Sequence, residues 1–169
     1  MKNTVFLFVL LFTTVAVAQQ TATIAPQPPI IPNYAYQYAA KIVCGRPAPT
    51  PTYAFQVGAH GTYFTQVNVH NPSRTQGVSI RKKFINAQPD ERPTKPTQFF
   101  GLGLEPDWAT QIDCHNILKH LGLPPGAYVE GFVILESTLE IDVVGLYTAD
   151  GPSGLISTME IDRVPARKF

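Results

Sequence analysis

Residues 128–149, YVEGFVILESTLEIDVVGLYTA, contain the densest run of strand-forming side chains in the protein. β-Branched and aromatic residues fill both halves, and a polar Glu-Ser-Thr break separates them. Alternation places Val133 and Leu135 on one face of the first half. It places Ile141 and Val143 together on one face of the second half. The pattern predicts two strands joined by a short turn, and this hairpin is the expected core of the domain.

Further strand-like runs lie on both sides, at residues 34–44, 62–70, 77–84, 99–101, 108–114 and 155–164. Apolar and polar side chains alternate in most of them, and turns rich in proline and glycine separate them. In the last run, alternation predicts that Met159 and Ile161 point inward. Glu160 and Asp162 would then point outward, and the tail after Pro165 would be loose.

One short helix is expected among these strands. Asp113 can act as the N-cap of residues 115–121, and Gly122, followed by a Pro-Pro pair after one residue, can end the helix. The predicted fold is therefore all-β, an antiparallel β-sandwich of Ig-like or jelly-roll-like type. It would have about 7–8 strands and one short helix.

The first 18 residues have the features of a secretory signal peptide. A lysine precedes an apolar run, and an Ala-Val-Ala sequence predicts cleavage between Ala18 and Gln19. The apolar run is short for a membrane span, so an uncleaved anchor is the less favoured alternative, and no transmembrane segment is expected after cleavage. Residues 19–33 then form an uncharged, proline-rich flexible leader, and residues 34–166 form a single domain. The expected location is the periplasm or the exterior.

Charge excludes some classes of partner. The signal peptide carries one of the 13 basic residues and none of the 12 acidic ones, so the mature chain is neutral. A neutral chain lacks the basic footprint that nucleic acids or anionic membranes require, and nucleic acid is not an expected partner.

The two cysteines predict one disulfide, between Cys44 and Cys114, because exported proteins meet an oxidising environment. Cys44 shares its strand phase with Ile42, and Cys114 shares its phase with Ile112. Both would therefore point inward, as a bridge between strands requires. A free catalytic thiol is the alternative.

No catalytic, cofactor-binding or metal-binding residues are nominated. His115 and His120 are five residues apart, whereas two metal ligands on one helix face are four apart. The carboxylate pairs 140/142 and 160/162 could support acid–base chemistry. Their place on the polar phase of strands favours a solvated face, with Arg81 and Lys83 as cross-strand partners. No cofactor is expected.

A series of motifs resembles a family of exported bacterial proteins of unknown function. The motifs are YAAKIVCG, VNVHNPS with IRKKF, PDWATQIDC, VEGFVILES with DVVGLYTA, and RVPAR, and they extend from about Tyr38 to Arg167. The strand order is also similar, at the level of the fold, to the small β-sandwich of sensory rhodopsin transducer proteins. This second likeness implies a binding module rather than an enzyme.

Three functions remain open: a non-enzymatic binding module outside the cytoplasm, a structural subunit of a surface assembly, and a hydrolase with a dispersed site. A protein or glycan partner is expected for the first. Its candidate recognition surface consists of Phe99, Phe100 and Trp108, which follow the polar loop of residues 86–98. The alternative is that Trp108, in phase with Ile112, caps the core.

Overall fold

A computed structural model of the protein describes residues 32–47, 61–87, 92–151 and 155–169. The predicted signal peptide and its cleavage site at Ala18 and Gln19 lie outside the described residues, as does all but the end of the leader. No helix in the described part of the chain is long and apolar enough to cross a membrane.

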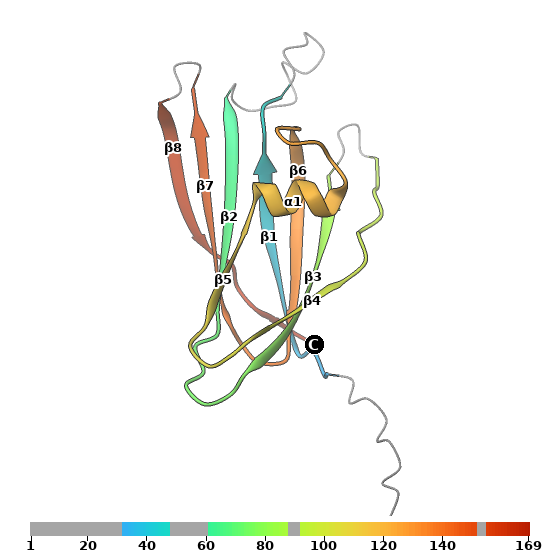
Figure 1. Cartoon of the computed structure of the whole chain (residues 1–169), viewed down its shortest axis with the longest axis vertical. Coiled ribbons are helices and arrows are strands. Elements are labelled where there is room, and N and C mark those ends of the chain that lie inside the picture. The colour runs from blue at the N-terminus through green and yellow to red at the C-terminus, as the bar shows by residue number, and fades with distance from the viewer. Residues whose placement is uncertain (1–31, 48–60, 88–91, 152–154) are drawn as a thin grey trace, which may run out of the picture. The chain divides into compact units, whose positions relative to one another are not determined.

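The described residues form two antiparallel sheets and one helix (Figure 1). Sheet A has the strand order β4-β3-β6-β1-β9, with bounds Phe100–Leu104, Val78–Asn86, Val129–Ser137, Tyr36–Cys44 and Arg167–Lys168. Sheet B has the order β5-β2-β7-β8, with bounds Ala109–Asp113, Thr62–His70, Asp142–Asp150 and Ile156–Arg163. Helix α1, Cys114–Leu121, follows β5. The predicted all-β antiparallel sandwich with one short helix is confirmed.

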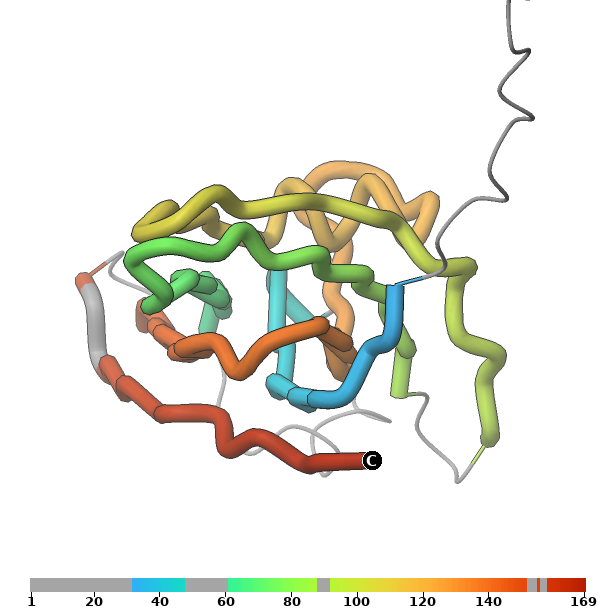
Figure 2. The backbone as a smooth tube through the Cα atoms, turned by 90° about the horizontal axis from the view of Figure 1, so that it is seen from below, coloured from blue at the N-terminus to red at the C-terminus, as the bar shows by residue number. Residues whose placement is uncertain are grey.

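The C-terminal residues are not a loose tail. The segment leaves β8, crosses from sheet B to sheet A, and ends as β9, red in Figure 2. Arg167 lies opposite Gln37, and Lys168 lies opposite Tyr36. Val164, at the crossing, is buried, and its N–H donates to the carbonyl of Val143 at 2.9 Å. Ordered structure therefore extends beyond the predicted domain boundary at residue 166.

The predicted faces of the core segment are confirmed, because Val133, Leu135, Ile141 and Val143 are all buried. The predicted hairpin is wrong. β6 pairs with β1 and β3 in sheet A, whereas β7 pairs with β2 and β8 in sheet B. The chain between them therefore passes from one sheet to the other. The alternation that predicted a hairpin is equally compatible with two strands in facing sheets, because each strand then also buries its apolar face in the core.

The predicted disulfide is confirmed. Cys44, at the end of β1, is bonded to Cys114, the first residue of α1, with a Cα–Cα distance of 5.6 Å. The bond joins sheet A to the end of sheet B and closes a loop with a sequence separation of 70 residues.

The predicted helix limits are also confirmed to within one residue. The Asp113 side chain accepts a hydrogen bond from the Asn116 N–H at 2.9 Å, and the Asn116 side chain accepts one from the Asp113 N–H. Gly122 ends the helix in the left-handed conformation, with φ 69°. Such a capping box and glycine end stabilise a helix of only eight residues. The helix buries Ile117 and Leu118.

Candidate functional site

The strand β8 presents its apolar side chains to solvent. Met159 is 66% exposed and Ile161 is 67% exposed, so the prediction that they point inward is wrong. Met159 lies opposite Thr148 of β7, and Ile161 lies opposite Leu146, on the outer face of sheet B. The inner face of β8 instead carries Glu160 and Asp162.

The position of β8 explains this inverted phase. β8 is the edge strand of sheet B, and on that side the described part of sheet A continues beyond β1 only with the two residues of β9. The inner face of β8 therefore meets a groove rather than the core. Without a core to bury apolar side chains, alternation does not determine which face turns inward.

The groove beneath β8 has a volume of about 660 Å³. Lys41 and Val43 of β1 form one wall, and Tyr147 of β7 with Glu160 and Asp162 of β8 forms the other. At its floor Thr65 of β2, which is buried, joins the two sheets. Its hydroxyl oxygen accepts a hydrogen bond from the Val43 N–H at 2.9 Å and donates one to the Val43 carbonyl at 2.8 Å.

Tyr147 owes its place in the groove to a glycine. A Cβ atom at Gly145, two residues earlier, would lie 2.5 Å from the Tyr147 hydroxyl oxygen. The absence of a side chain at Gly145 therefore lets the phenol lie along β7. Burial raises the pKa of Tyr147, and the carboxylates of Asp162 and Glu160 raise it further.

The charges of the groove are unequal. The Lys41 ammonium lies 3.0 Å from the Glu130 carboxylate, so its positive charge is matched within sheet A. The Tyr128 hydroxyl donates a hydrogen bond to the same carboxylate, and the Tyr128 ring packs edge-on against Tyr63. Glu160 and Asp162 on the opposite wall are exposed. The groove therefore presents negative charge and favours cationic groups.

The outer face of sheet B is apolar near β8. Phe64 of β2, 49% exposed, lies in the same cross-strand row as Thr148 and Met159. The next row contains Leu146 and Ile161, together with the polar Gln66. The name "β8 surface" is used below for the outer-face side chains of Phe64, Leu146, Met159 and Ile161.

The predicted recognition residues do not form one cluster. Phe99 and Phe100 lie at the start of β4, whereas Trp108 lies in the turn after its other end. Five residues of extended strand separate them by about 16 Å. The Phe99 ring covers Arg81, whose guanidinium is 4.3 Å from the ring centre. Phe100 packs against the His120 ring at 4.2 Å.

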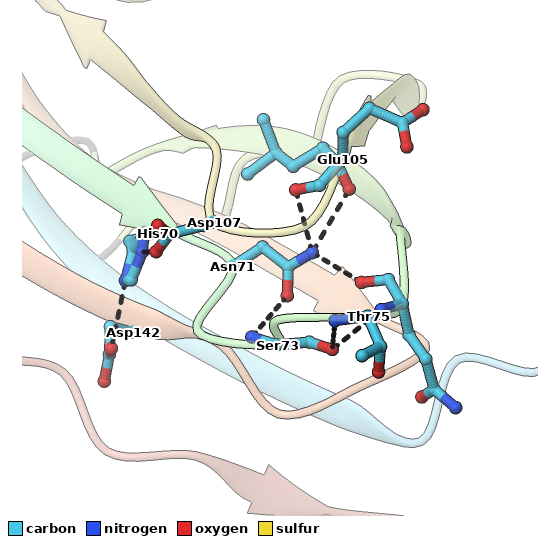
Figure 3. A network of polar contacts seen from close by, with 9 residues as sticks. His70, Asn71, Ser73, Thr75, Glu105, Asp107 and Asp142 are labelled. Atoms are coloured by element: carbon cyan, nitrogen blue, oxygen red, sulfur yellow. Dashed lines mark hydrogen bonds and ion pairs between the residues drawn. The ribbon is translucent and has the colours of Figure 1, made fainter.

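Trp108 is 60% exposed, so it does not cap the core. Its backbone carbonyl accepts a hydrogen bond from the buried Asn71 at 2.9 Å. The Asn71 side-chain amide donates to the carbonyls of Gln76, Leu104 and Glu105, as Figure 3 shows. One asparagine thus ties the loop after β2 to the turn after β4 and holds Trp108 in place.

His70, at the end of β2, lies between two carboxylates (Figure 3). Its Nε2 is 3.2 Å from Asp107, and its Nδ1 is 3.3 Å from Asp142. The hydrogen bond to Asp107 raises the pKa of His70, and the one to Asp142 raises it further. Asp142 also accepts from Arg163 at 2.9 Å. Sequence patterns do not indicate this arrangement, because His70, Asp107 and Asp142 come from separate strands and turns.

The predicted cross-strand partners of the carboxylate pairs are not observed. Arg81 pairs with Glu136 of β6 at 2.6 Å, and Lys83 lies over the Phe99 ring. Asp142 pairs instead with His70 and Arg163. Within the described ranges, no group of three or more His, Cys, Asp or Glu side chains could hold a metal ion.

Comparison with known proteins supports the fold. No family model matches the chain, and no curated protein matches it. The crystal structure of Thermotoga maritima 1070 superimposes with a TM-score of 0.50, over 79% of this chain and 95% of that chain, at 14% sequence identity. At this identity the likeness shows a shared β-sandwich fold alone. The resemblance to exported bacterial proteins and to sensory rhodopsin transducer proteins stays a prediction.

Proposed function

We propose that the protein is a non-enzymatic binding or interaction module of the bacterial periplasm or exterior. The observation that carries the proposal is the exposure of Met159 and Ile161 on an edge strand, each about two-thirds exposed. Edge strands of soluble proteins are usually protected, since a free edge with apolar side chains promotes pairing with another chain. An exposed apolar edge is therefore typical of an interaction site.

Two further observations support this function. The β8 surface adjoins the polar side chains of Gln66 and Arg163, and binding interfaces commonly combine an apolar centre with a polar rim. The Cys44–Cys114 disulfide is consistent with an oxidising, exported environment.

Photo-crosslinking from the β8 surface tests the proposal. A diazirine amino acid at Ile161 should give discrete adducts when the protein is exported by its native cells. The same group at Glu140, an exposed residue between β6 and β7, is the matched control and should give none. Absence of adducts from position 161, or the same adducts from both positions, would contradict an interaction site at β8.

The structural subunit of a surface assembly is the second candidate, because a second copy could also cover an exposed edge. Sedimentation velocity of the mature chain separates the two functions. A module remains monomeric as its concentration rises, whereas a subunit forms larger species that Ile161→Ser should dissolve.

A further inference from the structure

Among the described residues, the backbone of β8 has a free edge. The strand Ile156–Arg163 pairs on one side with β7, and no other described strand pairs with the opposite side. A free edge presents N–H and C=O groups that an extended polypeptide can use to extend the sheet. The main chain supplies affinity in this mode, and the side chains on each face supply specificity.

The two faces of this edge differ in chemistry. Met159 and Ile161 lie on the outer face, where Met159 also borders the groove, whereas Glu160 and Asp162 lie on the inner face and line the groove. Side chains of an added strand would stand about 5 Å from these residues on the matching faces. Apolar side chains would suit the outer face, and cationic side chains would suit the inner face.

We propose that β8 binds an extended polypeptide in which basic and apolar side chains alternate, paired along the free edge. This inference rests on the proposed function and specifies the class of partner. The apolar side chains extend the β8 surface. The basic side chains enter the groove and pair with Glu160 and Asp162.

The groove supports the inner half of this pattern. Its volume of about 660 Å³ accommodates the long side chains of lysine or arginine. Tyr147 lines the same wall as the two carboxylates. Lys41, the basic side chain on the facing wall, is already paired with Glu130 and repels an incoming cation only weakly.

The same charges oppose a second copy of the chain as the partner. In the central registers of an antiparallel pair of β8 strands, with the inner faces kept together, Glu160 lies opposite Asp162 or opposite its own copy. Like charges directly opposite each other destabilise a strand pair. Inward-pointing charges on an edge strand also protect against self-association. A basic partner is therefore favoured over a copy of this chain.

Peptide binding tests the inference directly. The peptide TKVKVKVT, blocked at both ends, is added to the ¹⁵N-labelled mature protein, and the backbone amide signals of β8 are followed by NMR. We expect saturable shifts confined to β8 and the groove. The charge-reversed peptide TEVEVEVT and the non-alternating peptide KKKVVVTT should shift these signals little.

Charge reversal in the protein provides the second measurement. The Glu160→Lys/Asp162→Lys double variant should bind TKVKVKVT roughly tenfold more weakly and gain binding of TEVEVEVT, because two attractive cross-strand pairs become repulsive. The matched control is Glu105→Lys/Glu140→Lys, which changes net charge equally at exposed residues outside the groove. The control should bind TKVKVKVT as the unmodified protein does.

The outcomes separate this inference from the proposed function. If position 161 gives specific crosslinks but TKVKVKVT does not bind β8, or binds equally after charge reversal, the inference is wrong and the proposed function stands. A dimer formed through β8 would also overturn the inference. If position 161 gives no specific crosslinks, the proposed function fails whatever the peptides do.

Discussion

The phenolic oxygen of Tyr38 lies 2.8 Å from the backbone nitrogen of Ile141 and accepts its hydrogen bond. Tyr38 belongs to β1 of sheet A, and Ile141 immediately precedes β7 of sheet B. Both residues are buried. One side chain thus satisfies the backbone at the point where the chain changes sheets.

Replacing this hydroxyl should therefore destabilise the fold. Tyr38→Phe keeps the ring but leaves the Ile141 N–H without its partner, which should cost about 1–3 kcal/mol of unfolding free energy. Urea denaturation measures the loss. The control is Tyr36→Phe, a partly buried tyrosine of the same strand that contacts Lys168 through its ring, and its effect should be much smaller. Equal losses would mean that the bond to Ile141 does not matter.

The disulfide should contribute strongly to stability. The chain-entropy model gives roughly 4 kcal/mol for a closed loop of about 70 residues. Cys44→Ser and Cys114→Ser should lower Tm to a similar extent, and the double variant should cost no more than either. Thermal denaturation of the three variants, with and without reductant, checks this. If Tm of the unmodified protein stays the same when reductant is present while the chain unfolds, the prediction is contradicted.

His70 should make stability depend on pH. Its pKa is raised in the folded protein by Asp107 and then by Asp142, so the charged form is favoured by folding. This stabilisation is fully present below the unfolded pKa of about 6.5 and is lost as the pH rises through the higher folded pKa. The unmodified protein should therefore lose stability relative to His70→Gln as the pH rises above about 6.5.

NMR titration of the His70 ring gives the folded pKa independently. Comparison with His70→Gln is needed because burial lowers the pKa of His120, which has the opposite effect on stability. A His70 pKa at or below that of an unfolded peptide would refute the predicted trend.

Trp108 provides an intrinsic probe of its own exposure. It is the one tryptophan in the sequence and is 60% exposed. Its emission should be red-shifted and readily quenched by iodide. Asn71→Ala should alter this emission, because Asn71 joins the two turns that hold Trp108 in place. A blue-shifted, unquenched emission would contradict the exposed position.

Sequence patterns predicted the features that local chemistry determines. The Asp113 cap and the Gly122 end define α1 through contacts within a few residues. Val133, Leu135 and Ile141 are buried as alternation predicts, because each lies on the face of its sheet that packs against the other sheet. The cysteines were paired correctly because only two were present.

The errors arose where distant partners decide the outcome. A polar break followed by a strand fits a hairpin and a crossing between sheets equally well, so the pairing of β6 and β7 was not predictable. Which face of β8 carries Met159 and Ile161 depends on where sheet A ends, close to β1. No residue of β8 indicates that position. His70, Asp107 and Asp142 meet only after both sheets are in place.

The order of strands along the chain constrains when folding can occur. β6 lies between β3 and β1, so the central strand of sheet A is synthesised after both of its neighbours, and in sheet B β7 is synthesised after β2. A nascent chain that ends before residue 129 cannot join β1 to β3. Folding must therefore wait for distant contacts, which slows it. Such a delay would keep the polypeptide unfolded until most of it has been synthesised, and an unfolded chain is the form that the proposed export would transport.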